Sequence, residues 1–213
     1  MADVLADEPV DLPLRGSDQV FDGLVWDLRR DTFELGGQPI VREYVDHPGA
    51  VAVLALDEHD RAFLIRQYRH PVRTREWEIP AGLLDVAGED PFVAAQRELA
   101  EEGDLAASEW AVLADFVTSP GGSDEAIRIY LARGIRESSA AFARQDEEAH
   151  MQTRWVALDE CVDAVLARRV QNPSLTIGVL AADAFRARGW QGLGAPDAAW
   201  PTRSTPRTEP APR

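Results

Sequence analysis

The sequence contains no lysine, so all 22 of its basic residues are arginines. This absence excludes a Walker A phosphate-binding loop, a Schiff-base lysine and a kinase-type ATP-binding lysine. Cysteine is almost as scarce: Cys161 is the only one, which permits no internal disulfide and fits a reducing cytoplasm. Because Cys161 lies in the apolar segment DECVDAVL, we expect it to be a small core residue rather than a nucleophile.

Long apolar runs are also missing. No stretch approaches the roughly 18 uninterrupted apolar residues of a transmembrane helix, and the acidic N-terminal stretch lacks the basic and apolar regions of a signal peptide. The net charge of −15 argues against general nucleic-acid binding, because an acidic surface repels phosphodiester backbones. We therefore expect a cytoplasmic protein without nucleic-acid or membrane partners, in which local arginines and a cation bind any anionic substrate.

The length of 213 residues and the 45% hydrophobic content predict one domain, or one domain with a small appendage. Apolar patterns predict strands, and the Asp90-Pro91 and Asn172-Pro173 pairs each predict the start of a helix. The expected strands lie in 20–45, with a turn at Gly36-Gly37, and at 50–56, 62–68, 110–117, 126–132 and 154–158; the expected helices span 91–102, 159–169 and 174–188. This mixture predicts an α+β, or α/β, fold with a mixed sheet.

One expected helix places three glutamates on a single face, because Glu98, Glu101 and Glu102 stand one, three and four residues apart. Two like charges that stand three or four residues apart destabilise a helix by about 0.2–0.5 kcal/mol per pair. Two interpretations remain open here: a solvated acidic surface, or a face that chelates magnesium through hard oxygen ligands. The preceding loop favours the second, since Gly82 permits the Ala81 carbonyl a close approach that a side chain would block.

Together with that loop, the stretch 82–105 resembles the signature of the Nudix hydrolase family, G-x5-E-x7-R-E-U-x-E-E-x-G-U, in which U is aliphatic. The matching positions are Gly82, Glu89, Arg97, Glu98, Leu99, Glu101, Glu102 and Leu105. The sequence departs from the pattern twice: one extra residue separates Gly82 from Glu89, and Gly103 comes one residue early, so that Asp104 takes the place of the last glycine. We expect the second departure to affect the end of the helix more than metal binding.

The resemblance implies a Nudix fold, with a mixed β-sheet sandwiched between helices and an N-terminal antiparallel β subdomain. It also implies a hydrolase that uses magnesium, or manganese, as its cofactor. The implied metal ligands are Ala81, Glu98, Glu101 and Glu102, with Arg97 and Glu101 taking part in catalysis and Gly82 lying at the substrate. The expected boundaries are a flexible N-terminus at 1–18, the β subdomain at 19–46, the hydrolase domain at 47–190 and a disordered tail at 191–213.

Residues outside the signature resemble the ADP-ribose pyrophosphatases, in their actinobacterial form. Pro120 lies in an SPG stretch fifteen residues after Leu105, and the segment WEIPAGLLDVAGE carries the longer loop of that group. The resemblance implies hydrolysis of ADP-ribose to AMP and ribose 5-phosphate. It further implies a homodimer in which the N-terminal strands complete the partner's site, with Arg42, Arg69 and Glu125 binding the substrate.

The general base that the resemblance implies lies in the acidic loop 143–155. The loop sequence EEAHM is similar to an EEAD-M pattern, which favours Glu148 over Glu147 as the residue that deprotonates the attacking water. Two alternatives stay open: a Nudix pyrophosphatase for another nucleotide sugar or a dinucleotide, and a non-catalytic module that senses ADP-ribose. The intact acidic cluster argues against the sensor, which needs no full set of metal ligands.

Overall fold

The chain divides into two compact units. The computed structural model describes residues 5–138 and 151–204, so that Glu148 lies outside the described residues. One unit comprises Met1–Pro48, Val117–Ala126 and Ala199–Arg213, and the other comprises Gly49–Phe116 and Ile127–Ala198. We call them the first unit and the second unit, in that order.

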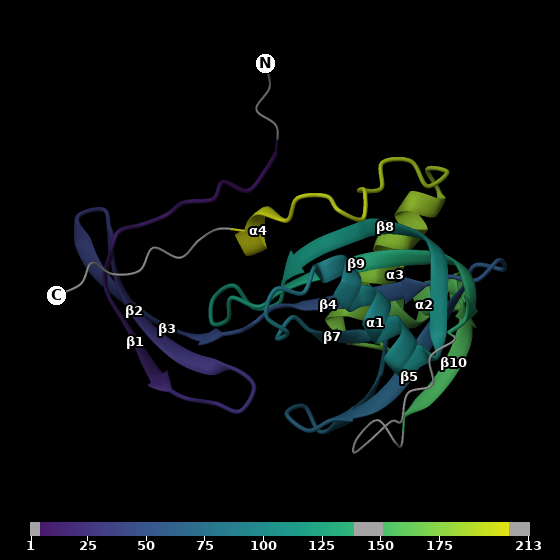
Figure 1. Ribbon diagram of the computed structural model, residues 1–213, viewed down its shortest axis with the longest axis horizontal. Helices are drawn as coiled ribbons and strands as arrows, with labels where there is room; N and C mark the ends of the chain where they lie inside the picture. The colour runs from purple at the N-terminus through teal and green to yellow at the C-terminus, as the bar shows by residue number, and fades with distance from the viewer. Residues whose placement is uncertain (1–4, 139–150, 205–213) are drawn as a thin grey trace. The chain divides into compact units, whose positions relative to one another are not determined.

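The first unit is built on a three-stranded antiparallel sheet (Figure 1). Its strands are β1 (Leu14–Phe21), β2 (Asp27–Leu35) and β3 (Gln38–Asp46), in the order β1-β2-β3. Gly36 and Gly37 have φ values of 60° and 75° and form the two-residue turn between β2 and β3, as their sequence predicts. The segment 1–18, expected to be flexible, overlaps β1 from Leu14 onwards, where the pairing with β2 places these residues in a sheet that composition does not reveal.

A segment that is distant in sequence also belongs to the first unit. The amide of Val45 donates to the carbonyl of Gly122 at 3.0 Å, and the amide of Asp124 donates to the carbonyl of Val45 at 3.2 Å. The Asp124 carboxylate in turn accepts from the amide of His47 at 2.8 Å. The first unit is therefore more than an N-terminal extension, since the turn that contains Pro120 is part of it.

Two sheets form the centre of the second unit. The four-stranded sheet has the order β7-β4-β9-β8 and the three-stranded sheet has the order β10-β5-β6. The strands are β4 (Ala50–Ala55), β5 (Arg61–Arg69), β6 (Thr74–Glu78), β7 (Ala81–Leu83), β8 (Leu105–Val117), β9 (Ala126–Glu137) and β10 (Gln152–Ala157). Every residue of β4 is buried, and β4 pairs with β9 in parallel and with β7 in antiparallel fashion. This combination makes the four-stranded sheet mixed, as predicted.

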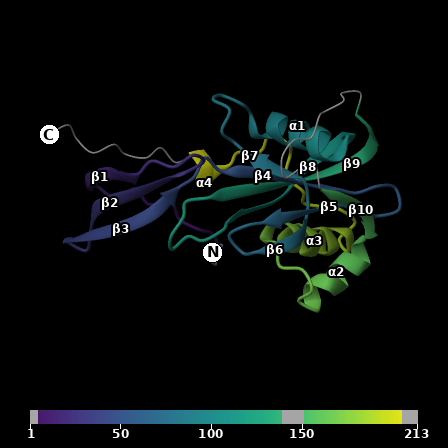
Figure 2. The same cartoon turned by 90° about the horizontal axis from the view of Figure 1, so that it is seen from below.

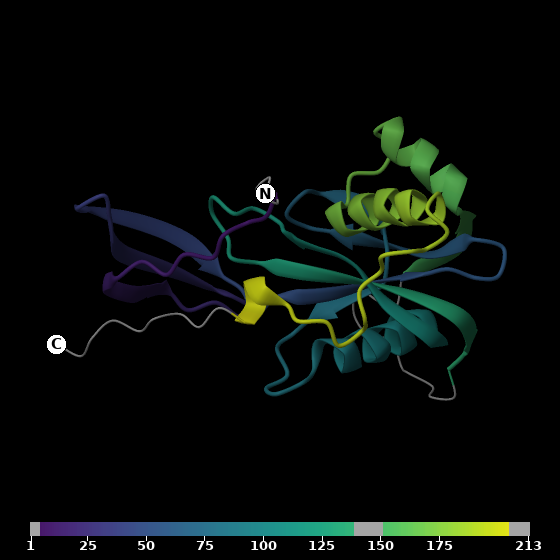
Figure 3. The same ribbon diagram turned by 90° about the horizontal axis from the view of Figure 1, so that it is seen from above.

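Helices cover the two sheets of the second unit from both sides (Figures 2 and 3). Helix α1 (Pro91–Gly103) lies on one side, and α2 (Leu158–Leu166) and α3 (Pro173–Arg186) lie on the other. The starts of α1 and α3 follow from local sequence, because the Asp90 and Asn172 side chains accept hydrogen bonds from backbone amides of the first turn. The fold is α+β, and no helix in the described residues is long and apolar enough to cross a membrane.

The segment after α3 forms an irregular strap along β8. Gly194 and Val112 exchange two backbone hydrogen bonds of 2.9 and 3.1 Å, and the carbonyl of Ala198 accepts from Nη1 of the buried Arg128 at 2.6 Å. In the first unit Trp200 is buried and the short helix α4 (Pro201–Ser204) follows. The tail expected to be disordered from 191 thus has partners in distant segments up to residue 204, which its composition does not reveal.

Candidate catalytic site on helix α1

The two buried glutamates of α1 face the short strand β7. Glu98 and Glu102 are only 8% and 6% exposed, and Glu102 Oε2 accepts from the backbone amide of Ala81 at 2.9 Å. The carboxylate of Glu98 lies against Gly82 so closely that a Cβ added at this glycine would overlap it. These contacts place Ala81 and Gly82 against this face of the helix, and the role of the Ala81 carbonyl as a metal ligand stays a prediction.

Arg97 connects three of the acidic side chains. Its Nε and Nη2 donate to both oxygens of Glu89 at 3.0 and 2.9 Å, and its Nη1 donates to Glu98 at 2.6 Å and to Glu101 at 3.0 Å. The hydrogen bonds to Glu89, together with the nearby charge of Glu98, raise the pKa of Arg97 against the effect of burial. The two hydrogen bonds from the Arg97 guanidinium also lower the pKa of the Glu89 carboxyl. The guanidinium therefore offsets the repulsion within the acidic cluster.

The helix ends where the sequence departs from the signature. Asp104 adopts the left-handed conformation, with φ 55° and ψ 30°, and its amide donates to the carbonyl of Ala100 at 3.1 Å. Glycine is the usual residue at such a C-terminal cap, because a side chain costs about 1 kcal/mol in this conformation. Asp104 therefore ends the helix in the manner of the glycine that the signature places there, and the register of Glu98, Glu101 and Glu102 is unchanged.

Arg69 is tied to a buried glutamate that the sequence analysis missed. Its Nε and Nη2 donate to the two oxygens of Glu78 at 2.8 and 2.6 Å, and the Gln67 amide donates to Glu78 at 3.3 Å. Glu78 is 2% exposed, so its charge depends on these partners. The pairing with Glu78 raises the pKa of Arg69, and the charge of Glu102 adds to this effect. The sequence carries one sign of this arrangement. Side chains alternate between the two faces of a strand, so Gln67 and Arg69 lie on the same face of β5.

Two of the other predicted substrate residues, Arg42 and Glu125, belong to the first unit. Arg42 is exposed on β3, where its Nη1 donates to the carbonyl of Val41 at 2.8 Å. Glu125 accepts from the Thr118 hydroxyl at 2.7 Å and lies 3.6 Å from Nε2 of His47, whose pKa is lowered by burial despite this carboxylate. Arg69 and Gly82, by contrast, lie in the second unit with the acidic helix.

Cys161 takes no part in this site. It is 4% exposed within the core of the second unit, and burial raises the pKa of its thiol to about 11. A thiol with such a pKa is protonated at neutral pH and is a weak nucleophile. The expectation that Cys161 is a core residue is confirmed.

The donor chemistry of α1 and β7 suits a hard divalent cation. Magnesium usually binds one or two carboxylates and completes its shell with water and substrate phosphate, all of them oxygen ligands. Glu98 and Glu102 supply two buried carboxylates beside the Ala81 backbone, whereas Glu101 is directed at Arg97. Within the described ranges, no three His, Cys, Asp or Glu side chains form a complete metal cage. Glu98 and Glu102 are therefore the two carboxylates of this face that could contribute to holding such an ion.

Comparison with known proteins agrees with this geometry. The NUDIX domain model matches residues 46–175, which is more than half of the chain. The chain belongs to the Nudix family. This Nudix protein is 46% identical over 169 residues to the ADP-ribose pyrophosphatase of Mycobacterium tuberculosis, covering 79% of this chain and 81% of the relative. It is 39% identical over 164 residues to the methanol dehydrogenase activator of Bacillus methanolicus, covering 76% and 88%.

A solved structure supports the Nudix fold. The crystal structure of an ADP compounds hydrolase superposes with a TM-score of 0.70 at 18% sequence identity, and the match covers 86% of this chain and 99% of that one. At this identity the likeness concerns the fold alone. The prediction of a Nudix fold, with a mixed sheet between helices, is confirmed.

Replacing Gly82 with alanine is expected to disable the site while leaving the protein folded. The added methyl group would overlap the Glu98 carboxylate, and a displacement of about 1 Å at a catalytic group can lower kcat about 10²-fold. Turnover and the midpoint of thermal unfolding are measured on the same preparation. Gly16→Ala is the matched control, because no heavy atom lies within 4 Å of its added Cβ. Equal turnover in Gly82→Ala and Gly16→Ala would contradict the close approach.

Proposed function

We propose that this Nudix protein hydrolyses the diphosphate of ADP-ribose to AMP and ribose 5-phosphate, with magnesium or manganese as its cofactor. The observation that carries the proposal is the buried pair of Glu98 and Glu102 against Ala81 and Gly82. The 46% identity to a protein named ADP-ribose pyrophosphatase supports the choice of substrate. The single buried cysteine is consistent with a cytoplasmic location.

In the proposed mechanism, Glu98, Glu102 and the Ala81 carbonyl would hold the cation. A divalent ion held there would supply positive charge against the diphosphate and would lower the pKa of water. Arg97 keeps Glu98 in place and orients Glu101, since its guanidinium donates to both carboxylates. Glu148, whose assignment rests on the family resemblance, takes the proton from the attacking water. Gly82, which is proposed to lie at the substrate, leaves room beside its backbone for the Glu98 carboxylate.

The arginines complete the proposed substrate site. Arg69 presents a guanidinium whose orientation is fixed by the buried Glu78, so little conformational entropy is lost when it meets an anion. Arg42 and Glu125 are proposed to contact the ligand from the first unit. The exposure of Arg42 on β3 is consistent with a partner from outside its own sheet.

A homodimer is proposed because the first unit exposes a large apolar patch. Phe21, Leu24, Val25 and Trp26, at the turn between β1 and β2, are 60%, 106%, 56% and 47% exposed. Contiguous apolar surface of this kind marks interaction sites on soluble proteins, and aromatic residues are enriched in interface cores. A second copy of the chain that brings its own first unit to the acidic helix would both cover this patch and deliver Arg42 to the site.

Light scattering tests the proposed dimer. We expect the unaltered protein to have the mass of a dimer and the combined Leu24→Asp and Val25→Asp variant to have that of a monomer, because buried unpaired carboxylates oppose association. Leu166→Asp is the matched control, since Leu166 is an exposed leucine of α2 outside the patch, 63% exposed. A monomeric unaltered protein, or dissociation by the control alone, would rule out this interface.

The proposed activity is tested with a panel of diphosphate-linked nucleosides. ADP-ribose, another nucleotide sugar and a dinucleotide are incubated with the protein and magnesium, and products are separated by chromatography. We expect the highest kcat/KM with ADP-ribose, with AMP and ribose 5-phosphate formed in equal amounts. Preference for another member of the panel would reassign the substrate within the family. Tight binding of ADP-ribose with no turnover in any metal would replace the enzyme with a sensing module.

A further inference from the structure

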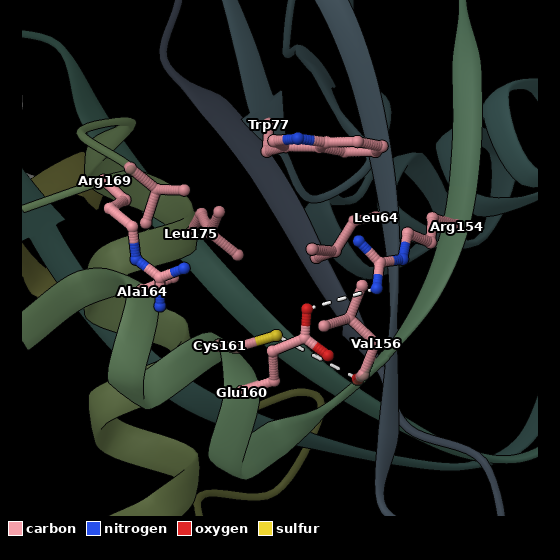
Figure 4. Close-up of a pocket in the computed structure, with 10 residues that line it drawn as sticks. Leu64, Trp77, Arg154, Val156, Glu160, Cys161, Ala164, Arg169 and Leu175 are labelled. Atoms are coloured by element: carbon pink, nitrogen blue, oxygen red, sulfur yellow. Dashed lines mark hydrogen bonds and ion pairs between the residues drawn. The ribbon is translucent and has the colours of Figure 1, made fainter. Parts of the chain in front are cut away.

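A pocket of about 210 Å³ is lined by residues of the three-stranded sheet and of the chain from α2 to α3 (Figure 4). These two helices lie on the side of the second unit away from α1 (Figure 3). The walls of the pocket come from β5, β6 and β10 of the three-stranded sheet and from both helices. The lining residues are Leu64, Trp77, Arg154, Val156, Glu160, Cys161, Ala164, Arg169, Val170 and Leu175. None of them takes part in the site around the acidic helix.

The interior of this pocket is apolar and flat on one side. Leu64, Val156 and Leu175 contribute aliphatic side chains, and Cys161 contributes a thiol that burial keeps protonated, with a pKa of about 11. Figure 4 shows the Trp77 indole edge-on above the pocket, so one face of its ring is turned toward the space. A planar apolar group can stack on such a face, which is worth about 0.5–1.5 kcal/mol beyond the burial of area.

The rim carries more positive than negative charge. Arg154 and Arg169 lie on opposite sides of the opening, and Glu160 lies between them and pairs with Arg154 at 3.1 Å. Among the described residues, no carboxylate pairs with the guanidinium of Arg169. Because Glu160 offsets Arg154, the rim keeps one positive charge in a chain whose net charge is −15. Guanidinium groups bind carboxylates through two parallel hydrogen bonds.

We propose that this pocket binds a small aromatic carboxylate, with its ring between Trp77 and the aliphatic wall and its carboxylate on Arg169. Pockets for nucleotide-sized or drug-sized ligands typically measure about 300–1,000 Å³, so this volume admits a single ring with a short anionic substituent. The site is therefore separate from the one proposed for a nucleoside diphosphate and does not depend on that activity. The protein thus has a second binding site, for a ligand of a different chemical class.

Three probes of equal size and different charge test the proposal by calorimetry on the full chain. We expect benzoate to bind with a Kd on the order of 1 mM, as suits a fragment of this size. Neutral benzamide is expected to bind about tenfold more weakly, because it lacks the charge that Arg169 meets. Cationic benzamidine is expected not to bind. Binding of benzamidine in preference to benzoate, equal binding of all three, or no binding of benzoate would overturn the proposal.

Variants place the bound probe in the pocket. Arg169→Gln is expected to weaken benzoate binding about tenfold, whereas the matched control Arg168→Gln, at an exposed neighbour that does not line the pocket, leaves the affinity unchanged. Ala164→Leu fills the space with a residue that favours helices and is expected to abolish binding while the unfolding temperature is retained. Equal effects of Arg169→Gln and Arg168→Gln, or benzoate bound by a folded Ala164→Leu variant, would refute the assignment.

Discussion

Glutamine at position 98 or 102 is expected to lower the kcat for ADP-ribose hydrolysis about 10³-fold, since a bound metal contributes several kcal/mol and about 1.4 kcal/mol corresponds to a factor of ten. Glu98→Gln and Glu102→Gln keep the size of the side chain and its ability to accept a hydrogen bond. Each removes one negative charge from a buried position, which lies beside Gly82 for Glu98 and beside Ala81 for Glu102. Initial rates measured across a magnesium titration should show both a lower plateau and a higher magnesium requirement.

A matched variant separates a loss of metal binding from a general effect of charge. Glu109 is an exposed glutamate of β8, so Glu109→Gln changes the net charge by the same amount without touching the site. We expect its magnesium titration to follow that of the unaltered protein. Near-normal turnover in both Glu98→Gln and Glu102→Gln would end the assignment of these residues as metal ligands, whatever the control shows.

Glu148→Gln is expected to lower kcat by about 10²–10⁴-fold, the usual contribution of a general base, while the affinity for ADP-ribose and magnesium is retained. The expectation comes from the position of this residue in an acidic loop after the signature, in a segment outside the described residues. Binding is measured by calorimetry under conditions of negligible turnover, and kcat by product formation. The pH profile of the variant should also lose its acidic limb.

The neighbouring Glu147→Gln is the control for this experiment, because it changes the charge of the same loop by the same amount. We expect its kcat to stay within a few-fold of the unaltered protein. If Glu147→Gln is instead the variant with the strongly lowered kcat, the general base is Glu147, one residue earlier than proposed. If both variants turn over normally, the proton acceptor lies elsewhere in the chain.

Local signals explain why the acidic helix could be predicted in detail. Asp90 and Pro91 define its start through a side-chain cap and a fixed φ, and both act within one turn of the chain. The spacing of Glu98 and Glu102 then determines which side chains share a face, whatever the helix packs against. The pairing of Arg97 with Glu101, four residues apart, follows from the same geometry.

Partners supplied by distant segments could not be predicted in this way. The bidentate bond from Arg97 to Glu89 depends on the path of the loop between β7 and α1, and the burial of Glu78 under Arg69 depends on the pairing of β5 with β6. The strap after α3 was missed for the same reason, since Gly194 gains its order from Val112 on β8. Composition reports only the local preference of a segment, whereas the order of these segments depends on contacts with residues that are distant in sequence.

The parallel pairing of β4 with β9 has a consequence for the synthesis of the protein. Ala50 pairs with Ile127 across the whole of α1 and β8, so the ribosome releases β4 long before the strand that covers one of its edges. Until then, the six buried residues of β4 leave that edge open. Nascent chains that stop before Ala126 should therefore aggregate or be degraded instead of forming a smaller domain, and translation pauses in α1 or β8 should increase the demand for chaperones.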